Sequence, residues 1–191
     1  MADELITAED ALLAEAIKAV THASGKQLVR VALLPGDIRD PDVLRQVTGA
    51  APAVFLAPLG GPVAGGPDNM QVPFVWSWLF VTNHAAGQQQ QLRGDARALG
   101  AYPLMQLVLP NIHGMTIPGV GTVSVTKIEN LFSARTKSTG ISMWAAPCKV
   151  KVPMPINFDN TTLDAFLETT ATHQLVDANE PAAVDNVQLE Q

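Results

Sequence analysis

The fold is decided by the stretch Phe74-Val75-Trp76-Ser77-Trp78-Leu79-Phe80-Val81. Its four aromatic residues fall on alternate positions, and successive side chains of a β-strand point to opposite faces of a sheet. The aromatic side chains therefore face one way, while Val75, Leu79 and Val81 face the other. A strand that is apolar on both faces is covered on both sides. We predict that this segment is a central strand of a sheet.

Further strands are predicted on both sides of this segment along the chain. Each is a short apolar or alternating run bounded by turn residues, which is the pattern typical of strands. These runs cover residues 27–34, 53–57, 122–128 and 140–152. Residues 117–121 are rich in Pro and Gly and are expected to form a turn.

The N-terminal segment is predicted to be a helix. Thr7 is its expected N-cap, because the acidic residue Asp10 follows three residues later, as in a capping box. Leu13, Ile17 and Val20 recur at helical spacing, so we expect them on the buried face. Ser24-Gly25 is expected to end the helix.

Two more helices are expected in the first 150 residues. Asp40-Pro41 predicts an N-cap followed by a first-turn proline, and hence a short helix over residues 42–47. A longer helix is predicted over residues 93–109. Pro103 lies inside it and should kink or restart the helix there.

A glycine-rich loop lies between residues 59 and 71, and we expect it to be the tip of an extended hairpin. It contains Gly60, Gly61, Gly65, Gly66 and Asp68.

The order of elements predicts an α+β fold. We expect a largely antiparallel β-sheet with two main helices packed on one face, an extended β-hairpin loop and a C-terminal arm. The expected organisation is a domain over residues 1–153 and an acidic arm over residues 154–191.

Charge is placed unevenly along the chain. The formal net charge is −6, and after Lys151 there are seven acidic residues and no Lys or Arg. A solvated acidic tail is one interpretation of this segment. We favour an arm that docks on a neighbouring subunit or partner. Within it, residues 162–171 are expected to form a short amphipathic helix around Leu163, Phe166 and Leu167.

The composition argues against several classes of protein. The negative net charge argues against general nucleic-acid binding, which needs a basic surface. The single cysteine, Cys148, excludes an intramolecular disulfide and fits a reducing cytoplasm. No stretch has the roughly 18 to 20 apolar residues that a membrane span requires. The acidic start Asp3-Glu4 is unlike a secretory signal. We therefore expect a soluble protein that is made inside the cell.

The sequence predicts no catalytic, cofactor or metal site. Asp37, Asp40 and Asp42 could hold a metal, but turn and capping roles explain them better. His84 and His113 lack a His or Cys at metal-ligand spacing, as do the other histidines. Cys148 has no motif that would supply a basic partner, and the glycine-rich loop lacks the P-loop ending. A small metal-dependent hydrolase using these acids with one of the two histidines stays open as an alternative.

Arg93 and Arg97 lie four residues apart in the predicted third helix, which places them on one helical face. They could form a clamp for a phosphate or carboxylate group. A solvated face, or one that forms salt bridges between subunits, is the interpretation we favour.

Several short sequence segments, in this order along the chain, resemble one protein family. They are Leu34-Pro35-Gly36-Asp37, Ala51-Pro52-Ala53-Val54-Phe55, Arg93-Gly94-Asp95-Ala96-Arg97, Leu99-Gly100-Ala101-Tyr102, Leu109-Pro110, His113-Gly114 and Glu129-Asn130-Leu131-Phe132-Ser133. Over roughly residues 5–152 the chain resembles the tail-terminator (tail completion) family of Mu-like phages. It departs from the family pattern at Pro103 and in the length of the acidic arm.

The resemblance implies a non-enzymatic structural subunit of the virion that is assembled in the bacterial cytoplasm. Such subunits form a ring, here expected to be a hexamer, on the last ring of the tail tube. The ring stops tube polymerisation and offers a surface to the head–tail connector or stopper protein. A sheath protein is a further partner if the tail is contractile, and DNA passes through the lumen without specific binding. The alternative within phage structure is a head-side connector or stopper ring.

On this interpretation, contacts with partners are expected at the hairpin loop and the arm. We expect the loop over residues 60–71 to reach the tube or an adjacent subunit, and the acidic arm to bridge subunits. The expected contact residues are Gly60, Gly61, Gly65, Gly66 and Asp68 in the loop, Arg93, Arg97 and Lys127 as acceptors of acidic groups, and Asp159 and Phe166 in the arm.

Overall fold

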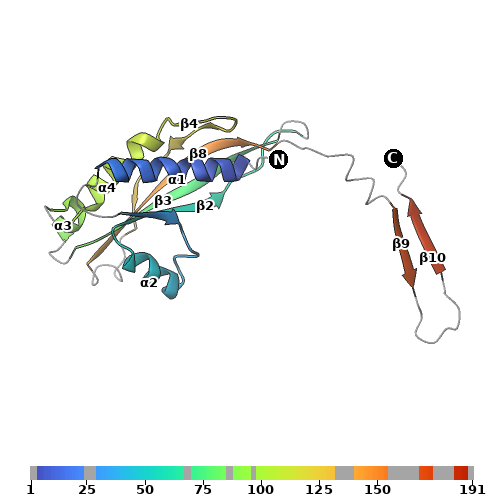
Figure 1. Cartoon of the computed structure of the whole chain (residues 1–191), viewed down its shortest axis with the longest axis horizontal. Coiled ribbons are helices and arrows are strands. Elements are labelled where there is room, and N and C mark those ends of the chain that lie inside the picture. Colours follow the sequence, from blue (N-terminus) through green and yellow to red (C-terminus); the bar gives the residue numbers. More distant parts are fainter. Residues whose placement is uncertain are drawn as a thin grey trace. The chain divides into compact units, whose positions relative to one another are not determined.

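The structure is a computed structural model that describes residues 4–23, 29–66, 70–84, 88–95, 98–131, 140–154, 168–173 and 183–188 (Figure 1). The chain divides into two compact units, Met1–Met154 and Pro155–Gln191, which we call the body and the C-terminal unit. In the C-terminal unit the described residues form an antiparallel pair of strands, β9 (Glu168–His173) and β10 (Ala183–Gln188).

The body is built on one sheet with the strand order β1-β2-β3-β8-β6, in which β7 also pairs with β8. The strands are β1 (Arg30–Leu33), β2 (Ala53–Gly60), β3 (Gln71–Asn83), β6 (Ser124–Val125), β7 (Glu129–Asn130) and β8 (Ile141–Pro153). Strands β1 and β2 are parallel, and the other described pairs of this sheet are antiparallel. The largely antiparallel sheet predicted from the sequence is therefore confirmed.

Strand β3 lies in the middle of the sheet, as predicted. It pairs with β2 on one side and along its whole length with β8 on the other. Trp76, Trp78 and Phe80 are buried in the larger core cluster, on one face of the sheet. Leu79 and Val81 are buried in the smaller cluster, on the opposite face. The alternation of side chains along this one strand thus supplies both cores.

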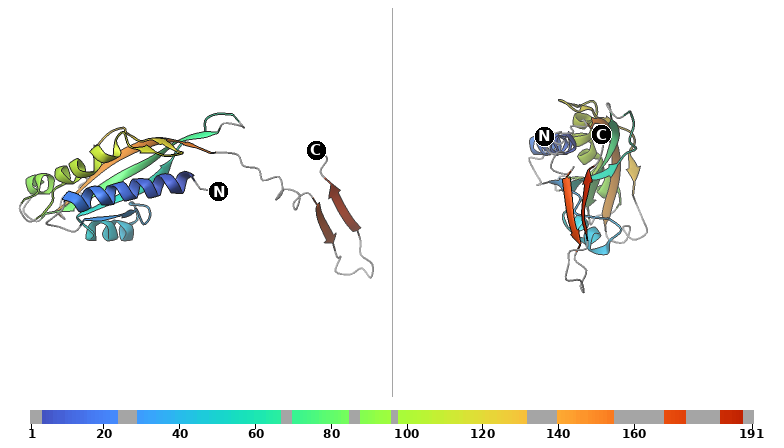
Figure 2. Two further views of the ribbon diagram at one scale, coloured as in Figure 1. Left: turned by 45° about the horizontal axis from the view of Figure 1, so that its top comes forward. Right: turned by 90° about the vertical axis from the view of Figure 1, so that its right-hand side faces the viewer.

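Helices cover both faces of the sheet (Figures 1 and 2). The two main helices, α1 (Glu4–Ala23) and α4 (Ala101–Ile112), pack against each other and against the larger core. The shorter α2 (Pro41–Gly49) packs on the smaller core through Val47. The α+β class with two main helices on one face is confirmed. No helix among the described residues is long and apolar enough to cross a membrane.

Helix α1 differs in detail from the prediction. The chain is already helical at Glu4, so Thr7 lies within the helix rather than at its N-cap. Its buried residues follow a four-residue step, Ala8, Leu12, Ala16 and Val20. Ile17 was expected on this face but is 48% exposed. The reason is that successive helical residues are rotated by about 100°, so Ile17 lies beside the buried stripe and not on it.

The single helix predicted over residues 93–109 is wrong, because the chain forms two helices there. They are α3 (Gln88–Arg93) and α4, and the segment between them includes Gly94 with a φ of 71°. This left-handed conformation ends α3 after Arg93. Pro103 is the third residue of α4, where a proline is tolerated because an N–H in the first helical turn has no partner within the helix.

Two other segments also differ from the prediction. The strand expected over residues 122–128 is divided: β5 (Gly121–Thr122) pairs with β4 (Thr116–Ile117) in a separate hairpin, while β6 joins the main sheet. The helix expected over residues 162–171 is contradicted at residues 168–171, which belong to strand β9. Thr169, Thr170 and Thr172 are β-branched and favour a strand. Residues 162–167 lie outside the described residues.

Cys148 is a core residue of β8 and is fully buried. Burial raises the pKa of its thiol from the ordinary value of 9.0 to about 11. Because the thiolate is the reactive form, we expect alkylation at pH 8 to be about 100-fold slower in the folded protein than in the urea-unfolded chain. Mass spectrometry of iodoacetamide-treated samples measures both rates, and equal rates would contradict this placement of Cys148.

Candidate assembly surfaces

The β2–β3 hairpin extends the sheet beyond its helix-covered part (Figure 2). Its described tip is held by two backbone hydrogen bonds of 2.8 Å between Ala64 and Gln71. Leu59 is 62% exposed and Val63 is 67% exposed, and neither is packed against a described core cluster. The hairpin therefore presents aliphatic side chains to solvent, where burial against a partner is favourable.

The glycines of the hairpin shape its tip. Gly60 and Gly65 have φ values of 81° and 94°, which side-chain-bearing residues rarely adopt. A Cβ on Gly61 would lie 2.3 Å from the carbonyl oxygen of Pro73, so only glycine allows the two strands to approach there. Gly66 has no such constraint. Asp68, also expected at this surface, lies outside the described residues.

Two of the basic residues expected to receive acidic groups, Arg93 and Lys127, are described by the structure. Arg93 is exposed at the last turn of α3, and Arg97 lies outside the described residues. Because α3 ends at Arg93, the single helix that was expected to carry both arginines is contradicted. Lys127 is bound within the body, with its Nζ 2.7 Å from Oε1 of Glu129. Asp159 and Phe166 lie outside the described residues.

The two described ends of the segment that follows Arg93 are held together. The carboxylate of Asp95 accepts a hydrogen bond of 2.9 Å from the backbone N–H of Ala98. Its other oxygen lies 3.0 Å from Nε2 of His84. A Cβ on Gly100 would lie 2.2 Å from the backbone nitrogen of Gly94, so the two glycines bring the ends of the loop into direct contact.

The acidic trio after β1 has the turn and capping roles expected from the sequence. Asp37 binds the guanidinium of Arg39, whose hydrogen bonds lower the pKa of Asp37 to about 2. Asp40 caps α2 by accepting a hydrogen bond from the N–H of Asp42. Asp42 in turn binds Arg45 at 2.9 Å. Each carboxylate thus has a local partner.

The histidines of the hydrolase alternative also have structural contacts. His84 contacts Asp95, and Nδ1 of His113 accepts a hydrogen bond of 3.1 Å from the N–H of Val125. In the part of the chain that the structure describes, no group of three His, Cys, Asp or Glu side chains could hold a metal. The acids and histidines named for that alternative do not meet in one described site.

A groove that the sequence did not lead us to expect runs beside the end of β8. Its volume is about 530 Å³, and it is lined by Gln71, Val120, Gly121, Thr122, Ser124, Lys149, Lys151 and Pro153. Lys149 and Lys151 are exposed, alternate along β8 and therefore lie on the same face of that strand. Neither forms an ion pair with a described residue. We call this feature the lysine groove.

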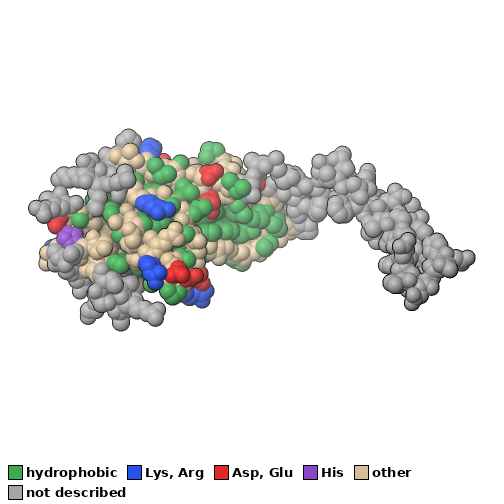
Figure 3. All heavy atoms as spheres, turned by 60° about the horizontal axis from the view of Figure 1, so that its bottom comes forward, with side chains coloured by type: hydrophobic (Ala, Val, Ile, Leu, Met, Phe, Trp, Pro, Cys, Tyr) green, Lys and Arg blue, Asp and Glu red, His purple; other side chains and the backbone are tan. Residues whose placement is uncertain are grey.

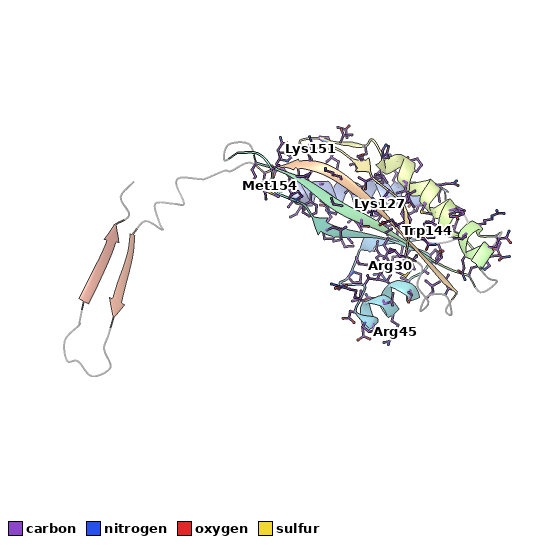
Figure 4. The ribbon with its side chains drawn as sticks, turned by 180° about the vertical axis from the view of Figure 1, so that it is seen from behind. Arg30, Arg45, Lys127, Trp144, Lys151 and Met154 are labelled. Carbon is purple, nitrogen blue, oxygen red and sulfur yellow. The ribbon has the colours of Figure 1, made fainter. Side chains whose placement is uncertain are left out.

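The position of the lysine groove is set by the sheet. Lys151 lies toward the end of β8 that leads to Met154, while Arg30 and Arg45 lie toward the other end of the body (Figure 4). The sequence signal for the groove was the Lys-x-Lys pattern in the last strand of the body, directly before an acidic segment without Lys or Arg. Alternation along a strand would have placed both lysines on one face, but we did not use this signal.

Apolar side chains also reach the surface of the body. Figure 3 shows one face on which hydrophobic side chains gather toward one end of the described part, with charged side chains scattered around them. Besides the hairpin, Ile128 and Leu131 next to β7 are 52% and 40% exposed. Exposed apolar patches of this kind are typical of surfaces that bind other proteins.

A family model described as Bacteriophage Mu, Gp37 matches residues 4–152, which span almost the whole body. The chain therefore belongs to this Mu-like phage protein family. The Mu-like prophage FluMu protein gp37 of Haemophilus influenzae is 27% identical to it over 157 residues, covering 82% of this chain and 74% of that protein. The recognition of a Mu-like phage family from the ordered segments of the sequence is confirmed.

Proposed function

We propose that the chain is a structural tail terminator. Copies of it form a ring, expected to be a hexamer, that caps the tail tube and stops its polymerisation. The same ring provides the attachment surface for the head–tail connector or stopper protein. The protein would then lie at the head–tail junction of the virion, after assembly in the bacterial cytoplasm. A sheath protein is an additional partner if the tail is contractile, and DNA passes through the lumen without specific binding.

Membership of the Mu Gp37 family over the body is the observation that carries this proposal, since it ties the chain to a Mu-like phage. The surfaces of the body are consistent with it. A ring needs two different patches on each subunit, so that one copy binds the next and rotation closes the circle. The exposed hairpin and the lysine groove are candidates for these patches, and they adjoin at one end of the sheet, where Gln71 belongs to both.

The low share of charged residues also supports an assembled role. Charged residues make up 16% of the chain, against about a quarter in typical soluble domains. Leu59 and Val63 are more than 60% exposed in one copy, and burial of such side chains in an interface is favourable. No catalytic residue, cofactor or metal takes part in the proposed role.

The test is a capture experiment with the full-length protein. Immobilised protein is incubated with lysate of phage-producing cells, and the retained phage proteins are identified by mass spectrometry. We expect the tail tube protein to be retained together with the connector or stopper protein. Capture of portal or adaptor protein without tube protein would overturn the terminator role and favour a head-side ring.

A further inference from the structure

The described strands of the C-terminal unit, β9 and β10, would gain stability by packing against another surface. Its described residues form only the two-stranded sheet of β9 and β10. An isolated two-stranded hairpin is marginally stable in water. The only cysteine of the chain, Cys148, belongs to the body, so the unit has no internal disulfide. Association with another surface is a source of stability that an acidic unit of this kind can obtain from a basic partner surface.

The charge of the C-terminal unit defines the kind of surface. All seven charged residues beyond Lys151 are acidic. Glu168 lies in β9 and Asp185 in β10, so the paired strands themselves carry acids. A surface that binds this unit must offer cations that are not already neutralised by acids of their own body.

The lysine groove meets that requirement among the described residues. Lys18, Arg39, Arg45 and Lys127 are each bound to an acid of the same body. Arg30 and Arg93 stand singly on β1 and α3. Lys149 and Lys151 are the described cations that occur as an unneutralised pair on one strand. They also line a concave feature large enough to receive part of another chain.

The groove offers polar and apolar contacts beside the two ammonium groups. Thr122 and Ser124 supply hydroxyl groups along one wall. Val120 and Pro153 supply apolar surface. A strand with the composition of β9, Glu-Thr-Thr-Ala-Thr-His, carries carboxylate, hydroxyl and methyl groups that match this lining.

We propose that the lysine groove of one copy receives the acidic C-terminal unit of the neighbouring copy. This inference rests on the proposed ring, because each subunit then carries one groove and one acidic unit, which form the two different halves of a head-to-tail interface. Carboxylates of the unit bind the ammonium groups of Lys149 and Lys151. Since exposed charges are screened over about 10 Å at 0.1 M salt, the contact weakens as the salt concentration rises.

The test uses full-length variants with reversed charge. The groove variant is Lys149→Glu with Lys151→Glu, and the arm variant is Glu168→Lys with Asp185→Lys. Sedimentation velocity measures assembly over a range of protein concentrations. We expect each variant alone to need at least about tenfold more protein to assemble than the unmodified chain. An equimolar mixture of the two is expected to assemble as well as the unmodified chain, because each acidic unit then meets a basic groove and each basic unit an acidic groove.

A matched control separates local charge from net charge. Lys18→Glu with Arg45→Glu changes the net charge by the same amount but lies outside the groove, and it is expected to assemble normally. Circular dichroism checks that every variant is folded. Equal assembly by the groove variant and the unmodified chain, or no recovery in the mixture, would overturn the proposal. A chain that carries both the groove and the arm substitutions provides a further comparison. If assembly recovers in that chain but not in the mixture, the C-terminal unit binds the groove of its own body, and the proposal is overturned.

The outcome is separable from that of the proposed function. Assembly in solution reports the contact between copies, whereas tail length in phage-producing cells reports termination. If the variants behave as expected but the protein does not retain tail tube protein, the docking stands and the terminator role fails. If tube protein is retained but the mixture of variants does not recover assembly, the terminator role stands and the docking fails.

Discussion

Replacing Gly100 by alanine is expected to destabilise the body by about 3 kcal/mol, at the upper end of the usual cost of overpacking. The added Cβ would lie 2.2 Å from the backbone nitrogen of Gly94 and 2.5 Å from the carbonyl oxygen of Leu92. Both are backbone atoms, so no side-chain rotation can relieve the clash. The loop must open, which would break its contact with the start of α4 and disturb the larger core through Ala101 and Leu104. Chemical denaturation measures the loss directly.

Gly49→Ala is the matched control for this prediction. Gly49 ends α2, and a Cβ added there meets no atom within 4 Å. Alanine has a higher helix propensity than glycine, so this change is expected to be neutral or to stabilise by up to about 1 kcal/mol. If Gly100→Ala unfolded at the same denaturant concentration as the unmodified chain, the close approach of Gly94 and Gly100 would be wrong.

The second large effect is expected at the hairpin. Leu59→Asp with Val63→Asp should leave the free energy of unfolding within about 0.5 kcal/mol, because both side chains are largely exposed. Binding through this surface should fall about 100-fold or more. The reason is that burial of an aliphatic side chain contributes about 1.5–3 kcal/mol, and every 1.4 kcal/mol is a factor of ten in affinity.

Two measurements on the hairpin variant separate its possible partners. Loss of tube-protein capture with normal ring assembly would place the hairpin on the tube. Loss of ring assembly would place it on the adjacent subunit. The control is Ile17→Asp, which introduces an acid at an exposed aliphatic residue of α1 and should change neither measurement. Normal assembly and normal capture by the hairpin variant would show that this surface has no role in either contact.

The features predicted correctly from the sequence are those with a local signal. The alternation from Phe74 to Val81 identified the central strand, because a period of two places the side chains whatever the neighbouring strands are. The Asp40-Pro41 pair identified α2, because the N-cap and the first-turn proline are adjacent in sequence. The extended hairpin followed from clustered glycines between two strong strands.

The features missed depend on contacts between distant backbone atoms. The break between α3 and α4 follows from the approach of Gly94 to Gly100, and hydrophobic periodicity does not report such an approach. Ile17 was assigned to the buried face from its spacing to Leu13 and Val20, but the buried stripe runs through the small residues Ala8 and Ala16, one position away. Strand β1 pairs in parallel with β2, which no local pattern predicts.

The candidate contact surfaces were predicted only in part. The loop glycines were singled out for their composition, and the structure gives Gly60, Gly61 and Gly65 a conformational reason. Lys127 was chosen by its charge, but its neighbour Glu129 already binds it. The lysine groove was missed because Val120 and Gly121 meet β8 only in the folded chain, almost 30 residues away in sequence.

The most direct test of the terminator role is tail length in particles made without this protein. The gene is inactivated in the phage, a complementing copy serves as the control, and tails in the lysate are measured by electron microscopy. We predict tails of uncontrolled length, with heads left unjoined, and a return to one length in the complemented strain. Tails of normal length beside unjoined heads, or normal joined virions, would contradict the account.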